Sequence, residues 1–308
     1  MSTKTRVVFD TDIGTDVDDA IALAFLLGSS DELQLDAVTT VYGDVHLRAR
    51  MARKLLALRG KGAENVPVYE GISAPLLGLQ PIYWPGHEGV GLLLEGDDFE
   101  TGPEQHAVDF LVAHVLANPG EIHLLAVGPL TNIAAAITRE PKFASSLKHL
   151  TIMGGRFMTE PNEWGPAEHN IKCDPEAAHI VFSSGAPISL IPLDVTLKAL
   201  IDVRGVAALR ARATAYHDAV AQQIADYPGF VARGGDTFLH DPLAAATLVR
   251  PEILHWTDLH VRVELTGTFT KAVTVGFLPS EEHPATARVA LSLDREASEA
   301  FIAERIAR

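Results

Sequence analysis

Short β-rich runs alternate with helix-like segments over the first two-thirds of the chain. Apolar strands at residues 6–9 and 35–42 are each followed by a helical run, at residues 20–28 and 46–60. This alternation predicts an α/β fold with a mostly parallel, Rossmann-like central sheet flanked by helices. Strands buried on both faces are almost continuously apolar, as these are. Further strands are expected at residues 66–71, 122–128, 150–155 and 188–194, and further helices at residues 107–117 and 175–185.

The pattern changes after residue 200, where strand-like runs follow one another with only short turns between them. Such spacing favours antiparallel pairing, because parallel strands need a longer crossover connection. These three runs cover residues 260–267, 269–277 and 286–293. A final helix is expected from Asp294. We find no linker, repeat or low-complexity tract in the sequence, so we expect one domain over residues 1–308 with a small antiparallel β region near its C-terminus.

The net charge of −15 argues against nucleic acid or an anionic membrane as a partner, since a negative field opposes both. No apolar run reaches the roughly 20 residues that a bilayer-spanning helix needs. The single cysteine, Cys173, cannot form an intrachain disulfide, and the N-terminal segment has no apolar leader. We therefore expect a cytoplasmic protein.

Five aspartates crowd into the segment DTDIGTDVDD, residues 10–19, between the first strand and the first helix. Carboxylates this close repel one another unless positive charge lies among them. A hard cation with oxygen ligands would supply that charge, and Gly14 would let the backbone turn sharply. The alternative is that some of these aspartates only cap the helix that starts near Ala20, because aspartate is a preferred N-cap.

Other polar residues follow neighbouring predicted strands: Asp44, Thr131, Asn132 and the loop 156–170. Ligands of open α/β sheets bind beyond the carboxyl ends of the strands, so these residues are expected to face one crevice with the aspartates. A second long loop covers residues 72–102. Loops of this length are often functional.

The segment DTDIGTDVDDA resembles the aspartate signature of the inosine–uridine nucleoside hydrolase family, in the version with two extra residues before the paired aspartates. The similarity continues in order through VTTVYGD, VGPLTNIA, IMGG, NEWGPAEHNIKCDPEAA and FLHDP, and covers essentially the whole chain. It implies an enzyme that hydrolyses the N-glycosidic bond of ribonucleosides to free base and ribose. It also implies Ca²⁺ as cofactor and assembly into a homo-oligomer, a tetramer or a dimer.

The resemblance implies a set of metal ligands and a catalytic base. The carboxylates of Asp12, Asp19 and Asp241 and the backbone carbonyl of Thr131 would bind Ca²⁺, with water and ribose hydroxyls completing the 6–8 oxygens that calcium accepts. Asp12 would also be the general base, since a cation acidifies the attacking water while a carboxylate receives its proton. Asp10 would support the cluster.

The resemblance also implies how the ribose is held. Cleavage of the C–N bond builds positive charge on the sugar, as in the oxocarbenium-like transition states of glycoside hydrolysis, and an anionic cage would stabilise it. The matching substrate-binding positions are Asp18, Asp44, Met153, Asn162, Glu168 and Asn170. Asp44 stands where many members carry asparagine, and His169 replaces an aromatic residue of well-known relatives, which leaves the substrate preference open.

The motif His240-Asp241-Pro242 has two interpretations. Aspartate followed by proline is a common helix start, with aspartate as N-cap and proline in the first turn. Asp174-Pro175 has the same form, and there we predict the capping role. At Asp241 the family pattern favours metal binding, and His240 could protonate the departing base because imidazole titrates near neutrality.

Residues for the nucleobase are less defined. The candidates are Trp84, His87, Trp164, Tyr227, Phe230 and Arg233, each of which is more typical of packing or surface than of ligand contact.

Two other functions compete. A haloacid-dehalogenase-like phosphatase also begins with an apolar strand and DxD; there Asp10 would be the nucleophile and Mg²⁺ the metal. We find no later acidic pair and lysine set for that scheme. A non-enzymatic calcium-stabilised protein that binds nucleosides or sugars is the other alternative, and the candidate base beside the metal argues against it.

Overall fold

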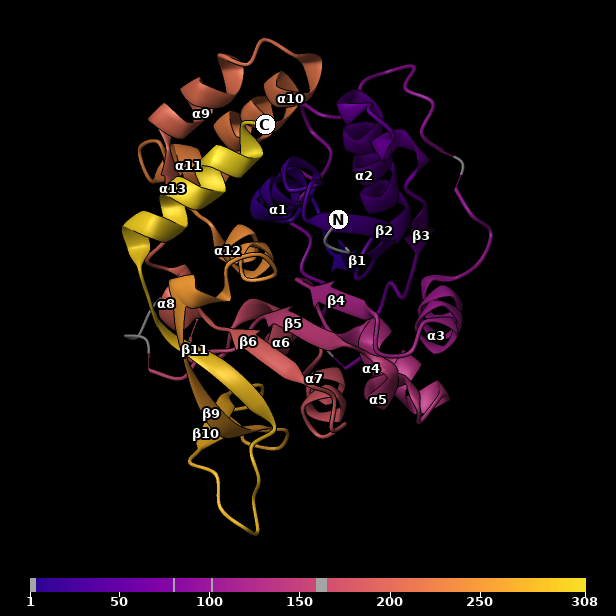
Figure 1. The fold of residues 1–308 in the computed structure, drawn as a ribbon, viewed down its shortest axis with the longest axis vertical. Helices are drawn as coiled ribbons and strands as arrows, with labels where there is room; N and C mark the ends of the chain where they lie inside the picture. The colour runs from indigo at the N-terminus through magenta and orange to yellow at the C-terminus, as the bar shows by residue number, and fades with distance from the viewer. Residues whose placement is uncertain (1–3, 80, 101, 159–164) are drawn as a thin grey trace.

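The computed structural model describes residues 4–79, 81–100, 102–158 and 165–308. Nine strands of this part form one sheet in the order β10-β9-β11-β6-β5-β4-β1-β2-β3 (Figure 1). Their bounds are β1 Thr5–Thr11, β2 Leu33–Thr40, β3 Val68–Glu70, β4 Ile122–Ala126, β5 His149–Met153, β6 Ile188–Ile191, β9 Leu254–Val263, β10 Thr274–Phe277 and β11 Ala287–Leu293.

The first six of these strands are parallel, with β1 paired to both β2 and β4 in the middle of this parallel part. The predicted mostly parallel sheet is therefore confirmed. Apolar side chains of successive strand residues enter two separate cores, as the twofold period of a strand requires. Phe9, Leu125 and Met153 lie in one core, while Val8, Leu124 and Ile152 lie in the other.

Each core is covered by its own layer of helices (Figure 1). One layer contains α1 Asp18–Gly28, α2 Val45–Arg59, α10 Ala215–Asp226, α12 His240–Ala246 and α13 Arg295–Ile306. The other contains α3 Ala107–Ala117, α4 Thr131–Arg139, α5 Phe143–Ser146 and α7 Pro175–Phe182. All residues of α1 are buried, and a helix that is apolar on every side belongs between other elements. The cluster of aspartates therefore leads directly into the interior.

The late strands pair antiparallel as predicted, with β9 between β10 and β11. They do not form a separate sheet, because β11 also pairs parallel with β6 and so continues the main sheet. The predicted final helix begins after Asp294, whose carboxylate accepts a hydrogen bond from the backbone N–H of Ala297.

A small second sheet, in which β7 Leu200–Asp202 pairs with β8 Asp236–Phe238, was not predicted. The chain between these two strands forms α9 Val203–Arg210, α10 and α11 Pro228–Ala232. The remaining short helices are α6 His169–Cys173 and α8 Leu193–Thr196. Strands of three residues carry too short a pattern to stand out in a sequence. In the described residues, we find no helix that is both long and apolar enough to cross a bilayer.

Candidate active site

The polar residues predicted to share a crevice lie at the carboxyl end of the sheet. Asp10 and Thr11 are the last residues of β1, and Asp12 follows them. Thr131 is the first residue of α4, which follows the neighbouring strand β4. Met153 is the last residue of β5, the next strand along. Since these three strands are parallel neighbours, their ends meet at one edge, where ligands of α/β sheets bind.

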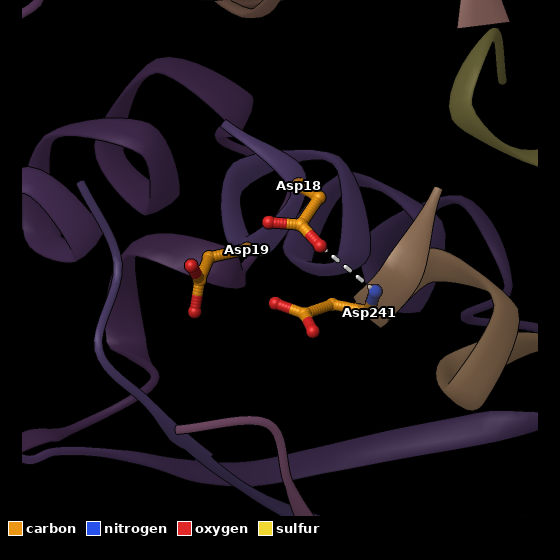
Figure 2. A group of neighbouring side chains, drawn as sticks. All are labelled: Asp18, Asp19 and Asp241. Carbon is orange, nitrogen blue, oxygen red and sulfur yellow. Dashed lines mark hydrogen bonds between the residues drawn. The ribbon is translucent and has the colours of Figure 1, made fainter. Parts of the chain in front are cut away.

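Three carboxylates converge above this edge (Figure 2). Oxygen atoms of Asp18, Asp19 and Asp241 all lie within 4.8 Å of one another, and the three side chains are almost fully buried. The first two belong to the first turn of α1 and the third to the first turn of α12. The backbone N–H of Asp241 donates to Oδ2 of Asp18 at 3.0 Å, which holds the two helix starts together (Figure 2).

The three side chains of this cluster are all carboxylates, so none of them supplies positive charge to balance the others. Burial raises the pKa of all three carboxyl groups well above the ordinary value, and repulsion from the neighbouring aspartates raises it further. Buried carboxylates at this spacing ionise together only if a cation compensates their charge. A divalent metal with a preference for oxygen fits this donor set. This group of three carboxylates therefore fits a divalent cation, and two of its members, Asp19 and Asp241, belong to the metal set that the resemblance implies.

None of Asp18, Asp19 and Asp241 caps its own helix, whereas Oδ1 of Asp16 accepts a hydrogen bond from the N–H of Val17 at 2.5 Å just before α1. The N-cap of α1 is Val17 and that of α12 is Leu239, and neither makes a side-chain capping hydrogen bond. Helix α12 begins one residue before Asp241, so that this aspartate lies inside the first turn and its side chain points to the cluster. At α7 the capping prediction is confirmed, because Oδ1 of Asp174 accepts from the N–H of Ala177 at 3.0 Å.

Asp12 lies beside the three carboxylates, and its charge contributes to the raised pKa of Asp19 and Asp241. It is outside the group of oxygens within 4.8 Å, whose third member is instead Asp18. Burial raises the pKa of Asp12 itself, while the positive charge of Arg48 opposes that rise. The family resemblance implies a ribose contact for Asp18, so the close grouping of Asp18 with Asp19 and Asp241 differs from that expectation.

Arg48 is a fully buried residue that was not among those predicted for the site. Its guanidinium donates to the backbone carbonyls of Asp12, Ile13 and Tyr42 and to the hydroxyl of Thr15. It therefore fixes the loop that carries the aspartates and places positive charge beneath it. A signal was present in the sequence, since Arg48 lies one turn before Met51 and Ala52 and two before Leu55, on the apolar side of its helix.

Asp10 supports the loop from inside the sheet. It is fully buried and accepts hydrogen bonds from Thr39 Oγ1 at 2.5 Å and Asn132 Nδ2 at 2.8 Å. Burial raises its pKa to about 7, the two hydrogen bonds acting against that rise. A phosphatase nucleophile must reach its substrate, and a fully buried carboxyl group held by two neighbours does not. This geometry agrees with the supporting role and argues against the phosphatase alternative.

A second network joins three predicted substrate residues: Met153, Glu168 and Asn170. The carboxylate of Glu168 accepts from the N–H groups of Gly155, Asn170 and Ile171, and burial raises its pKa to about 7. Nδ2 of Asn170 donates to the carbonyls of Val127 at 2.6 Å and Met153 at 3.2 Å. The network rigidifies α6 against the ends of β4 and β5, so these residues sit at the carboxyl edge of the sheet.

The other predicted contacts have varied surroundings. Thr131 is buried, and its hydroxyl donates to Oδ2 of Asp174 at 2.7 Å. Asp44 is exposed, and its Oδ1 caps α2 by accepting from the N–H of Leu47 at 2.9 Å. The capping of α2 was not predicted, and contact of Asp44 with substrate stays a prediction. Asn162, like Trp164, lies outside the described residues.

His240 begins α12, and its Nδ1 lies 2.7 Å from Oγ1 of Thr196. Burial, and then the positive charge of Arg233, lower the pKa of this imidazole to about 4. This value differs from the near-neutral titration expected from the sequence, because enclosure of the half-buried imidazole removes hydration from its charged form. At pH 7 the ring is neutral.

The nucleobase candidates divide into two groups. The hydroxyl of Tyr227 donates to Oδ2 of Asp16 at 2.8 Å, and the ring of His87 lies 5.9 Å from that of Tyr227. Together with the aspartate loop they line a cavity of about 50 Å³. Phe230 instead belongs to the core, while the guanidinium of Arg233 stacks over Phe238. Trp84 stacks on Arg48.

The fold and the site together define an α/β protein with a buried carboxylate centre suited to a divalent cation, at the ligand-binding edge of a mostly parallel sheet. The sequence model of the inosine-uridine preferring nucleoside hydrolases matches residues 7–300. The chain belongs to this family, and it is a nucleoside hydrolase.

Individual relatives agree with this assignment. Uridine nucleosidase 1 of Arabidopsis thaliana is 34% identical over 268 residues, which cover 85% of this chain and 79% of the relative. The non-specific ribonucleoside hydrolase RihC of Salmonella newport is 34% identical over 319 residues, covering 99% and 98%. Among solved structures, a plant nucleoside hydrolase, the PpNRh1 enzyme, has a TM-score of 0.88 at 30% identity and 99% coverage of both chains. A purine-preferring ribonucleoside hydrolase from Gardnerella vaginalis has a TM-score of 0.86 at 28% identity and 98% coverage of both.

Proposed function

We propose that the protein hydrolyses the N-glycosidic bond of ribonucleosides to free base and ribose in a Ca²⁺-dependent reaction. The observation that carries the proposal is the group of three buried carboxylates, Asp18, Asp19 and Asp241, joined from two helices at the carboxyl edge of the sheet. Relatives named for uridine, for purine ribonucleosides and for ribonucleosides in general leave the base preference open.

The metal set we propose is Asp12, Asp19, Asp241 and the backbone carbonyl of Thr131, with Asp18 close enough to share the charge of the cation. These are all oxygen donors, and most are carboxylates, which suits calcium better than a metal that prefers nitrogen or sulfur. When bound, the cation supplies positive charge that keeps the carboxylates ionised and acidifies the attacking water.

Asp12 is the proposed general base. It is almost fully buried at the end of β1, next to the group of three carboxylates, and burial raises its pKa. In this position its carboxylate is placed to receive the proton of the attacking water. Arg48 donates a hydrogen bond to the backbone carbonyl of Asp12, which holds in place the backbone that carries this carboxylate.

The acidic surroundings serve a second purpose. As the C–N bond breaks, the ribose gains positive charge, and ionised Asp12 and Asp18 stabilise that charge electrostatically. Glu168 and Asn170, fixed by backbone hydrogen bonds, are proposed to position the ribose hydroxyls with Met153 beneath them. Asp44 and Asn162 are proposed to complete the ribose contacts.

His240 is the proposed donor to the departing base. Its Nδ1 has Oγ1 of Thr196 as a partner, and if that hydroxyl donates, Nε2 carries the hydrogen of the neutral ring. A neutral imidazole can then stabilise the departing base through an Nε2–H hydrogen bond. Cleavage gains from such a donor because the anion of a purine or pyrimidine is a poor leaving group.

Metal analysis tests the cofactor. Purified protein should contain about one tightly bound Ca²⁺ per chain, and Asp19→Ala should lose it, because the variant removes a buried ligand oxygen. Free Ca²⁺ at about 100 times its dissociation constant should stabilise the wild-type fold by about 2.7 kcal/mol. Elemental analysis and thermal unfolding measure the two effects. Asp31→Asn, at an exposed aspartate, is the matched control. Active protein without any divalent cation would reject the site.

A substrate panel tests the reaction. Inosine, uridine, adenosine and cytidine should be offered without added phosphate, and chromatography should detect free base and ribose in equal amounts. The phosphatase alternative predicts instead release of phosphate from p-nitrophenyl phosphate, abolished by Asp10→Asn. We expect that compound to stay intact, since Asp10 is fully buried. Dominant phosphate release would favour the alternative, and binding of nucleosides without turnover would favour a non-enzymatic binding protein.

A further inference from the structure

A second pocket, lined by polar and apolar side chains, lies at the amino-terminal end of the parallel strands, opposite the aspartates. It has a volume of about 300 Å³ and opens among the amino-terminal halves of β4 and β5, the strand β11 and the residues that follow α12. Its lining is His123, Lys148, His149, Thr151, Thr247, Leu248, Pro251 and Arg288. The carboxyl ends of the same strands carry the candidate active site, so the two sites are separated along the strands.

The polar side chains of this pocket lie on one face of the sheet. His123 pairs with His149 in register, Thr151 with Ser189, and Ser189 with Arg288, which places them on four successive strands. Alternate residues Leu125, Met153 and Ile191 of the same strands enter the core beneath α12. An interior face that is apolar at one end thus becomes polar at the other.

Two cations contribute to this pocket. Arg288 donates from Nε to Oγ of Ser189 at 2.5 Å and stacks its guanidinium 4.5 Å from the ring centroid of Trp256. Ion pairs identified among the described residues include neither Arg288 nor Lys148. Asp258 is the register partner of Arg288 on β9 and attracts its charge, although no ion pair between them is identified in the described residues. The side chains that line the pocket carry Lys148 and Arg288 and no carboxylate, so the lining itself has excess positive charge.

One of the two histidines, His123, has hydrogen-bonding capacity that the described structure leaves unused. Nε2 of His149 lies 2.6 Å from Oγ of Ser189, whereas Nδ1 of His123 is buried and has no hydrogen-bond partner in the described structure. The rings lie 5.9 Å apart. Burial lowers the pKa of both to about 4, and the positive charge of Arg288 acts in the same direction. A buried polar atom without a partner costs free energy, which a ligand can recover.

We propose that this pocket is a binding site for a phosphate group, either free phosphate or the phosphate of a phosphomonoester. The lining offers a guanidinium, an ammonium, hydroxyls and imidazoles, and no carboxylate belongs to it. Arginine and lysine recognise phosphate through charge-assisted hydrogen bonds, and an imidazole gains a proton readily beside an anion. Its volume accommodates a phosphate together with a small organic group.

Calorimetric titration tests the site in the full-length protein. Inorganic phosphate and ribose 5-phosphate are titrated separately at constant ionic strength set with NaCl, below the concentration at which calcium phosphate precipitates. We expect saturable binding of at least one of them to the wild type. Arg288→Gln should weaken that binding at least about tenfold, because it removes a charge-assisted hydrogen bond. The matched control is Arg262→Gln, another arginine of the late strands that bonds a serine, Ser183, outside the pocket.

A second variant and a spectroscopic readout guard against misfolding. Lys148 is exposed, so Lys148→Ala should preserve the fold and still weaken binding several-fold. In NMR spectra, the ligand should shift the imidazole resonances of His123 and His149 and leave those of exposed His255 in place. Binding of phosphate alone or of ribose 5-phosphate alone would support the site and identify its source. Absence of saturable binding, or equal affinity in the wild type, Arg288→Gln and Lys148→Ala, would overturn the proposal.

Discussion

Asp12→Asn should lower kcat for inosine by at least about 10²-fold, the lower end of what general acid–base catalysis contributes. Asparagine keeps the size of the side chain and one ligand oxygen, yet its amide cannot accept the proton of the attacking water. Asp10, the other carboxylate at the end of β1, is held by Thr39 and Asn132 and so does not replace it. Steady-state kinetics at saturating Ca²⁺ measure the loss.

The control for this variant must separate the base from the ligand. Calcium content and thermal stability of Asp12→Asn should be measured alongside its turnover, because a lost cation alone would also slow the reaction. Asp294→Asn makes the same chemical change at the N-cap of α13, where asparagine caps as well as aspartate. It should keep wild-type activity. Near-native turnover by Asp12→Asn with bound calcium would reject Asp12 as the base.

The position of the site could be predicted from the sequence because it depends on local order along the chain. Strand β1 is short and apolar, and the aspartates follow it directly, so the parallel topology alone places them at the carboxyl edge. Asp174 was predicted as a cap for the same reason, since its partner, the N–H of Ala177, lies only three residues away. Local chemistry of this kind is readable without tertiary structure.

Contacts between distant segments could not be predicted from the residues in this way. The hydrogen bond from Asp241 to Asp18 joins positions 223 residues apart, and it decides which carboxylates form the closest group. The place of β11 between β6 and β9 likewise depends on the packing of the whole sheet. Asp241 was predicted as a metal ligand from the family resemblance. The residues alone also allowed it to cap a helix, and the start of α12 at His240 excludes that role.

Supporting residues were missed for a related reason. Arg48 and Tyr227 both act on the aspartate loop from other elements, Arg48 through backbone carbonyls and Tyr227 through the carboxylate of Asp16. Neither contact produces a sequence motif, because the partners of Arg48 are backbone carbonyls and Asp16 lies 211 residues from Tyr227. The sign of Arg48 in the sequence is its charged side chain on an otherwise apolar helix face.

His240→Ala should slow inosine hydrolysis by at least about 10²-fold and leave p-nitrophenyl riboside within a few-fold of the wild type. A purine anion is a poor leaving group and gains from the Nε2–H donor, whereas p-nitrophenolate leaves without help. Asp12 and the metal serve both substrates, so Asp12→Asn should slow both. Kinetics of the two substrates with each variant form the complete comparison.

The pH dependence of this contrast reports which form of the ring acts. With a pKa of about 4, His240 is neutral throughout pH 6–8, so the ratio of wild-type to His240→Ala turnover of inosine should stay constant there. If the imidazolium of an ordinary histidine were the donor, that ratio would fall about tenfold per pH unit above its pKa of about 6.5. A defect in the fold at the start of α12 would instead slow both substrates alike, and this outcome would reduce His240 to a structural residue. Undiminished inosine turnover by His240→Ala would remove the residue from the mechanism.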